Sequence, residues 1–376
     1  MVAHELRDHL EVIWGAVVAA FIVIALTPAV AGMARRFGAV DQPDEERRIH
    51  RIPIPRLGGI AMFFGIIVPS LAFLDLTRPV RGVLIGCAIA TAVGAIDDFR
   101  GLRWWEKLGG QILAASIPVI FGVWVDHFTF PFLGVYDLPS WLGGTLTVVW
   151  IVAVMNMVNF LDGLDGLAAG VCGIAGVTFS VIALSLGKPN AAIFSAIVFG
   201  ATLGFLRHNF FPARVFMGDS GAMLLGFSLA AVSVDGLLKT AATVALFFPL
   251  LVLAVPILDT GFVVARRLKY RQPITAPDRT HLHHRFVNIG FSQRRAVVYI
   301  YFWVATLAAA ALGTRFIPFR EDGQWHTGST IAAAALGLLA VAASVYMVYL
   351  LEIVKLANPR IRRRRREAEQ QARRTA

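Results

Sequence analysis

The chain has 376 residues, of which 57% are hydrophobic and 16% are charged, and its mean hydropathy is +0.68. Because a soluble chain carries about 25% charged and about 45–50% apolar residues, this composition excludes a disordered protein, a secreted disulfide scaffold and an ordinary cytosolic enzyme. The formal net charge of +11 has to be interpreted from where the charges fall.

Eleven stretches are mostly apolar over about the 20 residues that a helix needs to cross a bilayer. In chain order they are 12–32, 57–76, 80–97, 108–125, 142–161, 165–186, 190–206, 220–234, 240–264, 296–314 and 329–352. The first is too long for a signal peptide, follows acidic residues and has no small-residue cleavage site after it. We therefore expect an all-α, polytopic integral membrane protein with about eleven transmembrane helices.

The charges predict the orientation of these helices. With the N-terminus outside, 28 of the 35 basic and 15 of the 24 acidic residues fall on the inner side, so that side carries +13 and the outer side −2. The positive-inside rule then places the C-terminus in the cytoplasm. We expect one membrane domain over residues 1–356 and a disordered basic tail over 357–376, which faces anionic lipid. Nucleic-acid binding is disfavoured, because no basic fold with interleaved aromatic residues accompanies the tail.

Ionisable groups at membrane depth are costly and therefore indicate function. Four polar clusters all fall on the predicted inner side, and the first is Asp97-Asp98 at the end of the third stretch, in AIDDFRG. Two carboxylates at a helix C-terminus need a cation or a proton to offset them, because that end favours positive charge. Mg²⁺ or a nearby basic residue such as Lys107 could supply it, and a solvated helix end paired with arginines is the alternative.

The second and third clusters are NFLDGLDG and FMGDSG. In the second, Asp162 and Asp165 would share a helix face after Asn159, although a plain inter-helix turn also fits this composition. In the third, Asp219 opens the eighth stretch shortly after Asn209, and a helix N-cap is the alternative interpretation. Magnesium bound to phosphates commonly uses one or two carboxylates, so Asp219, on the same membrane face as Asp97 and Asp98, could contribute to a magnesium site.

The fourth cluster, DRTHLHHR, contains Arg279, His281, His283 and His284 in the longest inner loop. Zinc is disfavoured, because no cysteine is near and the arginines would repel the metal. Diphosphate oxygens suit this set through charge-assisted hydrogen bonds, and the basic loop 41–59 adds further cations. Together the clusters predict phosphoryl transfer between a soluble phosphate compound and a lipid phosphate.

Five segments resemble, in order, the motifs of the polyprenyl-phosphate N-acetylhexosamine-1-phosphate transferases: RIPIPRLGG, AIDDFRG, NMVNFLDGLDGLAAG, NFFPARVFMGDSG and DRTHLHHRF. The resemblance implies a bacterial plasma-membrane enzyme with a cytoplasmic active site. It transfers a sugar 1-phosphate from a UDP-sugar to polyprenyl phosphate, releases UMP and requires Mg²⁺ or Mn²⁺. The histidine motif and the eleven stretches are similar to the UDP-N-acetylglucosamine branch. A phospho-N-acetylmuramoyl-pentapeptide transferase or another UDP-sugar donor is the alternative.

The clusters and this resemblance together assign roles to thirteen residues. The expected catalytic residues are Asp97, Asp98, Lys107, His283 and His284. The expected substrate-binding residues are Asn159, Asp162, Asp165, Asn209, Phe216, Arg279 and His281. By the resemblance, Phe216 stacks on uracil, Lys107 holds phosphates, and Asp219 holds the metal, for which Asp98 is the second candidate.

The expected partners are a UDP-N-acetylhexosamine, polyprenyl phosphate and membrane lipid, with homodimer formation left open. A transporter is the main rival from another functional class. Transporters tend to place polar sites near the bilayer midplane, between internal repeats. In this sequence the acidic clusters share one membrane face and no repeat is visible, so an enzyme is favoured.

Overall fold

The computed structural model describes residues 9–41, 53–130, 134–238, 250, 253–269, 291–317, 320–321, 324–325 and 327–350. Within these ranges the α-helices are α2 (Glu11–Phe37), α3 (Gly58–Phe73), α4 (Arg78–Arg100), α5 (Trp104–Ile120), α6 (Ser140–Leu161), α7 (Leu167–Ser185), α8 (Pro189–Asn209), α9 (Gly218–Val232), α11 (Ala254–Lys269), α13 (Gln293–Phe316) and α14 (Thr327–Leu350). A π-helical turn, η1 (Ser233–Leu238), follows α9 directly. Each of the eleven predicted stretches overlaps one of these α-helices, which confirms the helical fold.

Seven of the described helices are long and apolar enough to cross a membrane, namely α2, α4, α6, α7, α8, α13 and α14. This confirms a polytopic membrane protein in outline, whereas the number of crossings and the orientation of the termini stay predictions. The ninth predicted stretch, 240–264, is described only in part, and its helix α11 continues to Lys269. The basic tail over 357–376 lies outside the described residues.

Three short antiparallel hairpins join the helices and were not predicted. They are β1 (Val40–Asp41) with β2 (Ile54–Pro55), β3 (His127–Phe130) with β4 (Gly134–Asp137), and β5 (Arg320–Glu321) with β6 (Gln324–Trp325). Strands of two to four residues are too short to show the alternating pattern that identifies a strand in a sequence.

Burial differs strongly among the helices and places α7, α8 and α9 at the centre of the bundle. Almost every residue of α7 and α9 is buried, whereas the outer helices α2 and α14 expose large apolar side chains such as Phe21 and Leu338. Exposed apolar surface of this kind suits contact with lipid. Small residues let the helices approach closely, as membrane helices do. At Gly204 of α8, a Cβ atom would lie 2.5 Å from the carbonyl oxygen of Ala20 in α2.

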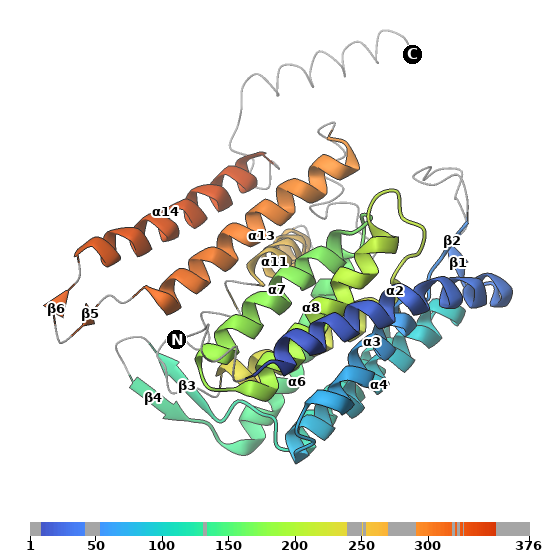
Figure 1. Cartoon of the computed structure of the whole chain (residues 1–376), viewed down its shortest axis with the longest axis horizontal. Helices are drawn as coiled ribbons and strands as arrows, with labels where there is room; N and C mark the ends of the chain where they lie inside the picture. The colour runs from blue at the N-terminus through green and yellow to red at the C-terminus, as the bar shows by residue number, and fades with distance from the viewer. Residues whose placement is uncertain are drawn as a thin grey trace, which may run out of the picture.

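The predicted polar motifs gather at one end of this bundle. The carboxyl ends of α2, α4, α6 and α8 meet the amino ends of α3, α5, α7, α9 and α13 there, beside the β1–β2 hairpin. The other two hairpins lie toward the opposite end (Figure 1). The prediction that these motifs share one side is therefore confirmed for the clusters that the structure describes.

Candidate active site

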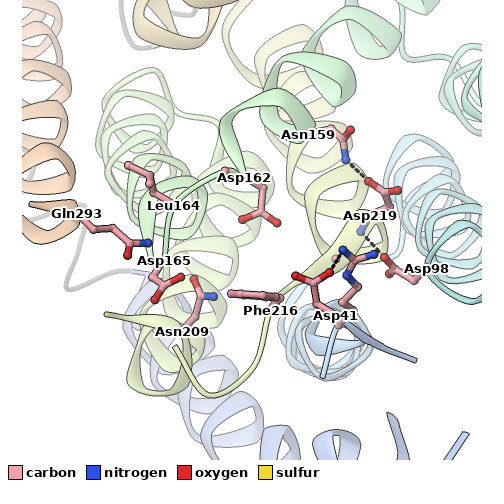
Figure 2. Close-up of a pocket in the computed structure, with 13 residues that line it drawn as sticks. Asp41, Asp98, Asn159, Asp162, Leu164, Asp165, Asn209, Phe216, Asp219 and Gln293 are labelled. Atoms are coloured by element: carbon pink, nitrogen blue, oxygen red, sulfur yellow. Dashed lines mark hydrogen bonds and ion pairs between the residues drawn. The ribbon is translucent and has the colours of Figure 1, made fainter. Parts of the chain in front are cut away.

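A cavity of about 400 Å³ opens at this end of the bundle. Seven predicted site residues line it: Asp98, Asn159, Asp162, Asp165, Asn209, Phe216 and Asp219. Figure 2 shows Asp165 and Asn209 on one wall, Asp98, Asn159 and Asp219 on the other, and Asp162 and Phe216 between them. Asp97 and Lys107 lie beside the second wall. Arg279, His281, His283 and His284 lie outside the described residues.

Asp98 caps helix α9 from a different helix. Its Oδ1 accepts a hydrogen bond from the backbone N–H of Asp219 at 2.8 Å, and its Oδ2 accepts bonds from the backbone N–H and hydroxyl of Ser220 at 3.0 and 2.8 Å. These amides belong to the first turn of a helix, which has no intrahelical acceptors for them. The cap of α9 is therefore the carboxylate of Asp98 in α4, and the Asp219 side chain stays available for other contacts.

Lys107 joins two acidic residues from different helices. Its Nζ lies 2.9 Å from Oδ2 of Asp97 and 3.1 Å from Oδ2 of Asp219. Asn159 donates a hydrogen bond to the other oxygen of Asp219, and Leu102 donates its backbone N–H to Asp97 at 2.6 Å. The adjacent aspartates thus face different partners: Asp97 holds Lys107, while Asp98 holds the helix that carries Asp219.

The opposite wall is built by the turn between α6 and α7 and by the last residue of α8. Asn209 is buried, accepts a bond from the N–H of Gly166 at 3.0 Å and donates one to the carbonyl of Val215 at 2.9 Å. Asp165 is also buried and accepts a bond from the N–H of Ala213 at 2.9 Å. Both side chains hold two loops together at the edge of the cavity, and their predicted contacts with substrate stay predictions.

Asp162 has an unusual protonation equilibrium. Withdrawal of its carboxyl group from water is the main cause, the carboxylates of Asp219, Asp98 and Asp165 add to it, and together they raise the pKa of Asp162 to about 8. These four carboxyl groups face one cavity and therefore repel one another. A bound cation would relieve this repulsion.

Three lining residues were missed by the sequence analysis: Asp41 at the end of β1, Arg56 directly after β2, and Gln293 at the start of α13. Asp41 and Arg56 form an ion pair. Both lie in the loop 41–59, which was predicted only to add cations. Arg56 also belongs to the quoted motif RIPIPRLGG, which could have drawn attention to it. Gln293 carried no such signal, because it lies outside the recognised motifs.

The side-chain oxygens of the cavity suit a hard divalent cation whose coordination shell is completed by the substrate. Within the described ranges, no three His, Cys, Asp or Glu side chains are grouped closely enough to enclose a metal ion. Magnesium usually keeps several waters and binds through one or two carboxylates plus substrate phosphates. Asp219 lines the cavity together with Asp98 and Asp162, and these carboxylates fit that mode, in which phosphate oxygens supply the remaining ligands.

Comparison with known proteins identifies the family. A model described as glycosyl transferase family 4 matches residues 80–237, which include Asp97, Asp98, Lys107 and Asp219. The chain is also 39% identical over 286 residues to a probable undecaprenyl-phosphate N-acetylglucosaminyl 1-phosphate transferase of Bacillus subtilis, covering 76% of this chain and 80% of the relative. The chain belongs to glycosyl transferase family 4. The resemblance expected from the motifs is confirmed.

Two further relatives show the range of this family. A decaprenyl-phosphate N-acetylglucosaminephosphotransferase of Mycobacterium tuberculosis is 36% identical over 352 residues, covering 85% of this chain and 87% of the relative. A phospho-N-acetylmuramoyl-pentapeptide-transferase of Desulforudis audaxviator is 33% identical over 334 residues, covering 81% and 97%. The chain is thus more similar to these N-acetylglucosamine phosphotransferases than to this pentapeptide enzyme.

Proposed function

We propose that this family member transfers N-acetylglucosamine 1-phosphate from UDP-N-acetylglucosamine to polyprenyl phosphate. The products are polyprenyl-diphosphate-N-acetylglucosamine and UMP, and the reaction begins the assembly of a cell-envelope glycan. The observation that carries the proposal is the position of Asp219, at the amino end of α9 in the cavity, against Lys107 and Asn159. The names of the relatives support the acceptor and the sugar.

In this reaction a phosphate oxygen of the acceptor attacks the β-phosphorus of the donor, and the bond between that phosphorus and UMP breaks. A magnesium or manganese ion, when bound, would neutralise negative charge on the donor phosphates. Asp219 is the ligand that we propose for it. Asp98 already accepts three hydrogen bonds out of the about four that a carboxylate can take, which supports a role in holding Asp219 in place.

Lys107 is the second positioning element in this proposal. Its ammonium group, held by Asp97, lies where it can approach a phosphate oxygen beside Asp219. Preorganised charges of this kind stabilise the negative charge of a phosphoryl-transfer transition state. The histidine motif with His281, His283 and His284, together with Arg279, remains our candidate for further diphosphate contacts, and Phe216 for stacking on uracil.

We also propose that all eleven predicted helices cross the membrane, with the N-terminus outside and the cavity on the cytoplasmic face. The support is the charge asymmetry of the sequence together with the gathering of the polar motifs at one end of the bundle. A nucleotide-sugar donor made in the cytoplasm would reach the cavity from this side. Cysteine labelling of residues in the β1–β2 and β3–β4 hairpins in sealed vesicles would test the orientation.

A panel of donors tests the reaction. Purified protein in detergent is supplied with Mg²⁺, undecaprenyl phosphate and either UDP-N-acetylglucosamine, UDP-N-acetylgalactosamine or UDP-N-acetylmuramoyl-pentapeptide, and UMP release is measured. We expect UMP from UDP-N-acetylglucosamine, only in the presence of both the lipid and the metal. Turnover of the pentapeptide donor alone would overturn the choice of sugar. No UMP from any donor would overturn the proposed function.

A further inference from the structure

The cavity is short of positive charge for the substrates that we assign to it. Asp41, Asp98, Asp162, Asp165 and Asp219 line it, and Arg56 is the only basic side chain among the described residues in its lining. The proposed reaction brings a diphosphate and a lipid phosphate together, and each phosphate needs cationic or N–H partners. Lys107 can approach one phosphate oxygen, but its charge is already shared between Asp97 and Asp219.

The backbone at Arg56 is firmly placed beside α9. Its N–H donates to the carbonyl of Ala39 at 3.1 Å, and the carbonyl of the preceding Pro55 accepts the N–H of Phe216 at 2.8 Å. Its own carbonyl packs against Gly218, which has a φ of +68° and no room for a Cβ atom. The base of the Arg56 side chain is therefore fixed next to the residue that precedes Asp219.

The guanidinium group, in contrast, is only lightly held. It pairs with Asp41, and the two side chains are 45% and 32% exposed. An ion pair this exposed adds little to stability, because water screens it and both side chains lose rotational freedom. Asp41 therefore gives up the guanidinium at little cost.

We propose that Arg56 binds a phosphate group of the substrates, exchanging Asp41 for two phosphate oxygens. The planar guanidinium matches phosphate oxygens in a bidentate manner that a lysine ammonium cannot reproduce. The phosphate belongs either to the donor diphosphate or to the lipid acceptor, which share this chemistry. The inference rests on the proposed function and adds a binding residue to it.

Steady-state kinetics of UMP release tests the inference, with the concentrations of UDP-N-acetylglucosamine and undecaprenyl phosphate varied separately. We expect Arg56→Gln to raise the KM of one substrate about 10- to 100-fold, with a smaller change in kcat. A rise for the donor identifies its diphosphate as the ligand, and a rise for the acceptor identifies the lipid phosphate. Arg56→Lys should recover only part of the loss, and Asp41→Asn should leave both KM values unchanged or lower.

Arg36→Gln is the matched control, because Arg36 is an exposed arginine in the last turn of α2 at the same end of the bundle. Unchanged KM values in Arg56→Gln, or a loss in Asp41→Asn as large as in Arg56→Gln, would overturn the inference. If Arg56→Gln does not fold, the KM values of Arg56→Lys are used instead: a raised KM for one substrate supports the inference, and unchanged KM values overturn it. If the wild type turns over no donor, the proposed function fails, and calorimetric binding of inorganic pyrophosphate to the wild type and to Arg56→Lys then tests Arg56 alone.

Discussion

The carboxylate of Asp98 should act by holding the amino end of α9, and the replacement Asp98→Asn tests this directly. The wild-type side chain accepts three hydrogen bonds from α9, two of them from backbone amides. An asparagine keeps one acceptor oxygen but turns an NH₂ group toward the remaining donors. At least one helix amide then loses its partner.

The expected cost follows from these contacts. A hydrogen bond to a charged group contributes about 1.5–3 kcal/mol, and the loss of a helix cap costs about 0.5–2 kcal/mol. We therefore expect Asp98→Asn to lower the free energy of unfolding by about 2–3 kcal/mol. Ser220→Ala removes the hydroxyl that lies 2.8 Å from Oδ2 of Asp98 and 3.2 Å from the carbonyl oxygen of Met217, and it should cost about 1.5 kcal/mol. Because the two side chains share one contact, the double variant should lose less than the sum.

Thermal unfolding in detergent and UMP release at varied Mg²⁺ concentration provide the two assays. A displaced Asp219 should lower kcat of Asp98→Asn by about 30- to 150-fold, if the full 2–3 kcal/mol appears in the barrier, and should raise the Mg²⁺ concentration needed for half-maximal activity. Asp137→Asn is the control, because Asp137 is exposed on β4 toward the opposite end of the bundle. A loss of kcat far beyond 150-fold, with unchanged stability and an unchanged Mg²⁺ requirement of the residual activity, would contradict this role and would point to Asp98 as a proton acceptor.

Three further predictions concern the surroundings of Asp219. Lys107→Met should lower the free energy of unfolding by about 1–3 kcal/mol, because the ion pairs of Lys107 with Asp97 and Asp219 are only partly buried. Added Mg²⁺ should stabilise this variant more than the wild type. An equal effect of Mg²⁺ on both proteins would argue against a position shared by the metal and the ammonium group. Asp162→Asn should stabilise the metal-free protein more at pH 8.5 than at pH 5 in thermal unfolding. The wild-type carboxyl keeps its proton in the folded state up to a pKa of about 8, so the wild type loses stability as the pH rises from about 4 to 8; a pH-independent difference would contradict this. In Gly94→Ala, the new Cβ would lie 2.5 Å from the backbone of α9, so its melting temperature and activity should fall, whereas Gly109→Ala, with nothing within 4 Å, should melt and turn over like the wild type.

The sequence predicted the helices well because each one depends on a simple local property. A run of about 20 apolar residues is sufficient to identify a membrane helix, and the residues around Gly94 or Ala20 need no distant partner for that assignment. The clusters around Asp97, Asp162 and Asp219 were recognised for the opposite reason, because polar groups in such runs are costly. The prediction that these clusters lie on one side followed from assigning successive loops to alternate sides of the membrane. The structure confirms that these three clusters lie at one end of the bundle.

What the sequence could not predict are contacts between residues that lie far apart in it. The cap that Asp98 provides joins residues 121 and 122 positions apart. The alternative in which Asp219 is itself the N-cap was wrong, because the carboxylate that accepts the α9 amides comes from α4. The pairing of Arg56 with Asp41 depends on a hairpin with two-residue strands, which has no readable periodicity. Gln293 reaches the cavity only because α13 begins beside α7, and nothing in the local sequence indicates that neighbour.

Asp219 should organise the proposed transfer at this cavity, and UMP release by Asp219→Asn measures this role most directly. Purified wild type, Asp219→Asn and Asp137→Asn are compared with UDP-N-acetylglucosamine, undecaprenyl phosphate and saturating Mg²⁺, after gel filtration has shown that all three are monodisperse. We expect UMP from the wild type and from Asp137→Asn, and a loss of at least about 100-fold in Asp219→Asn. Wild-type turnover by Asp219→Asn would contradict the account.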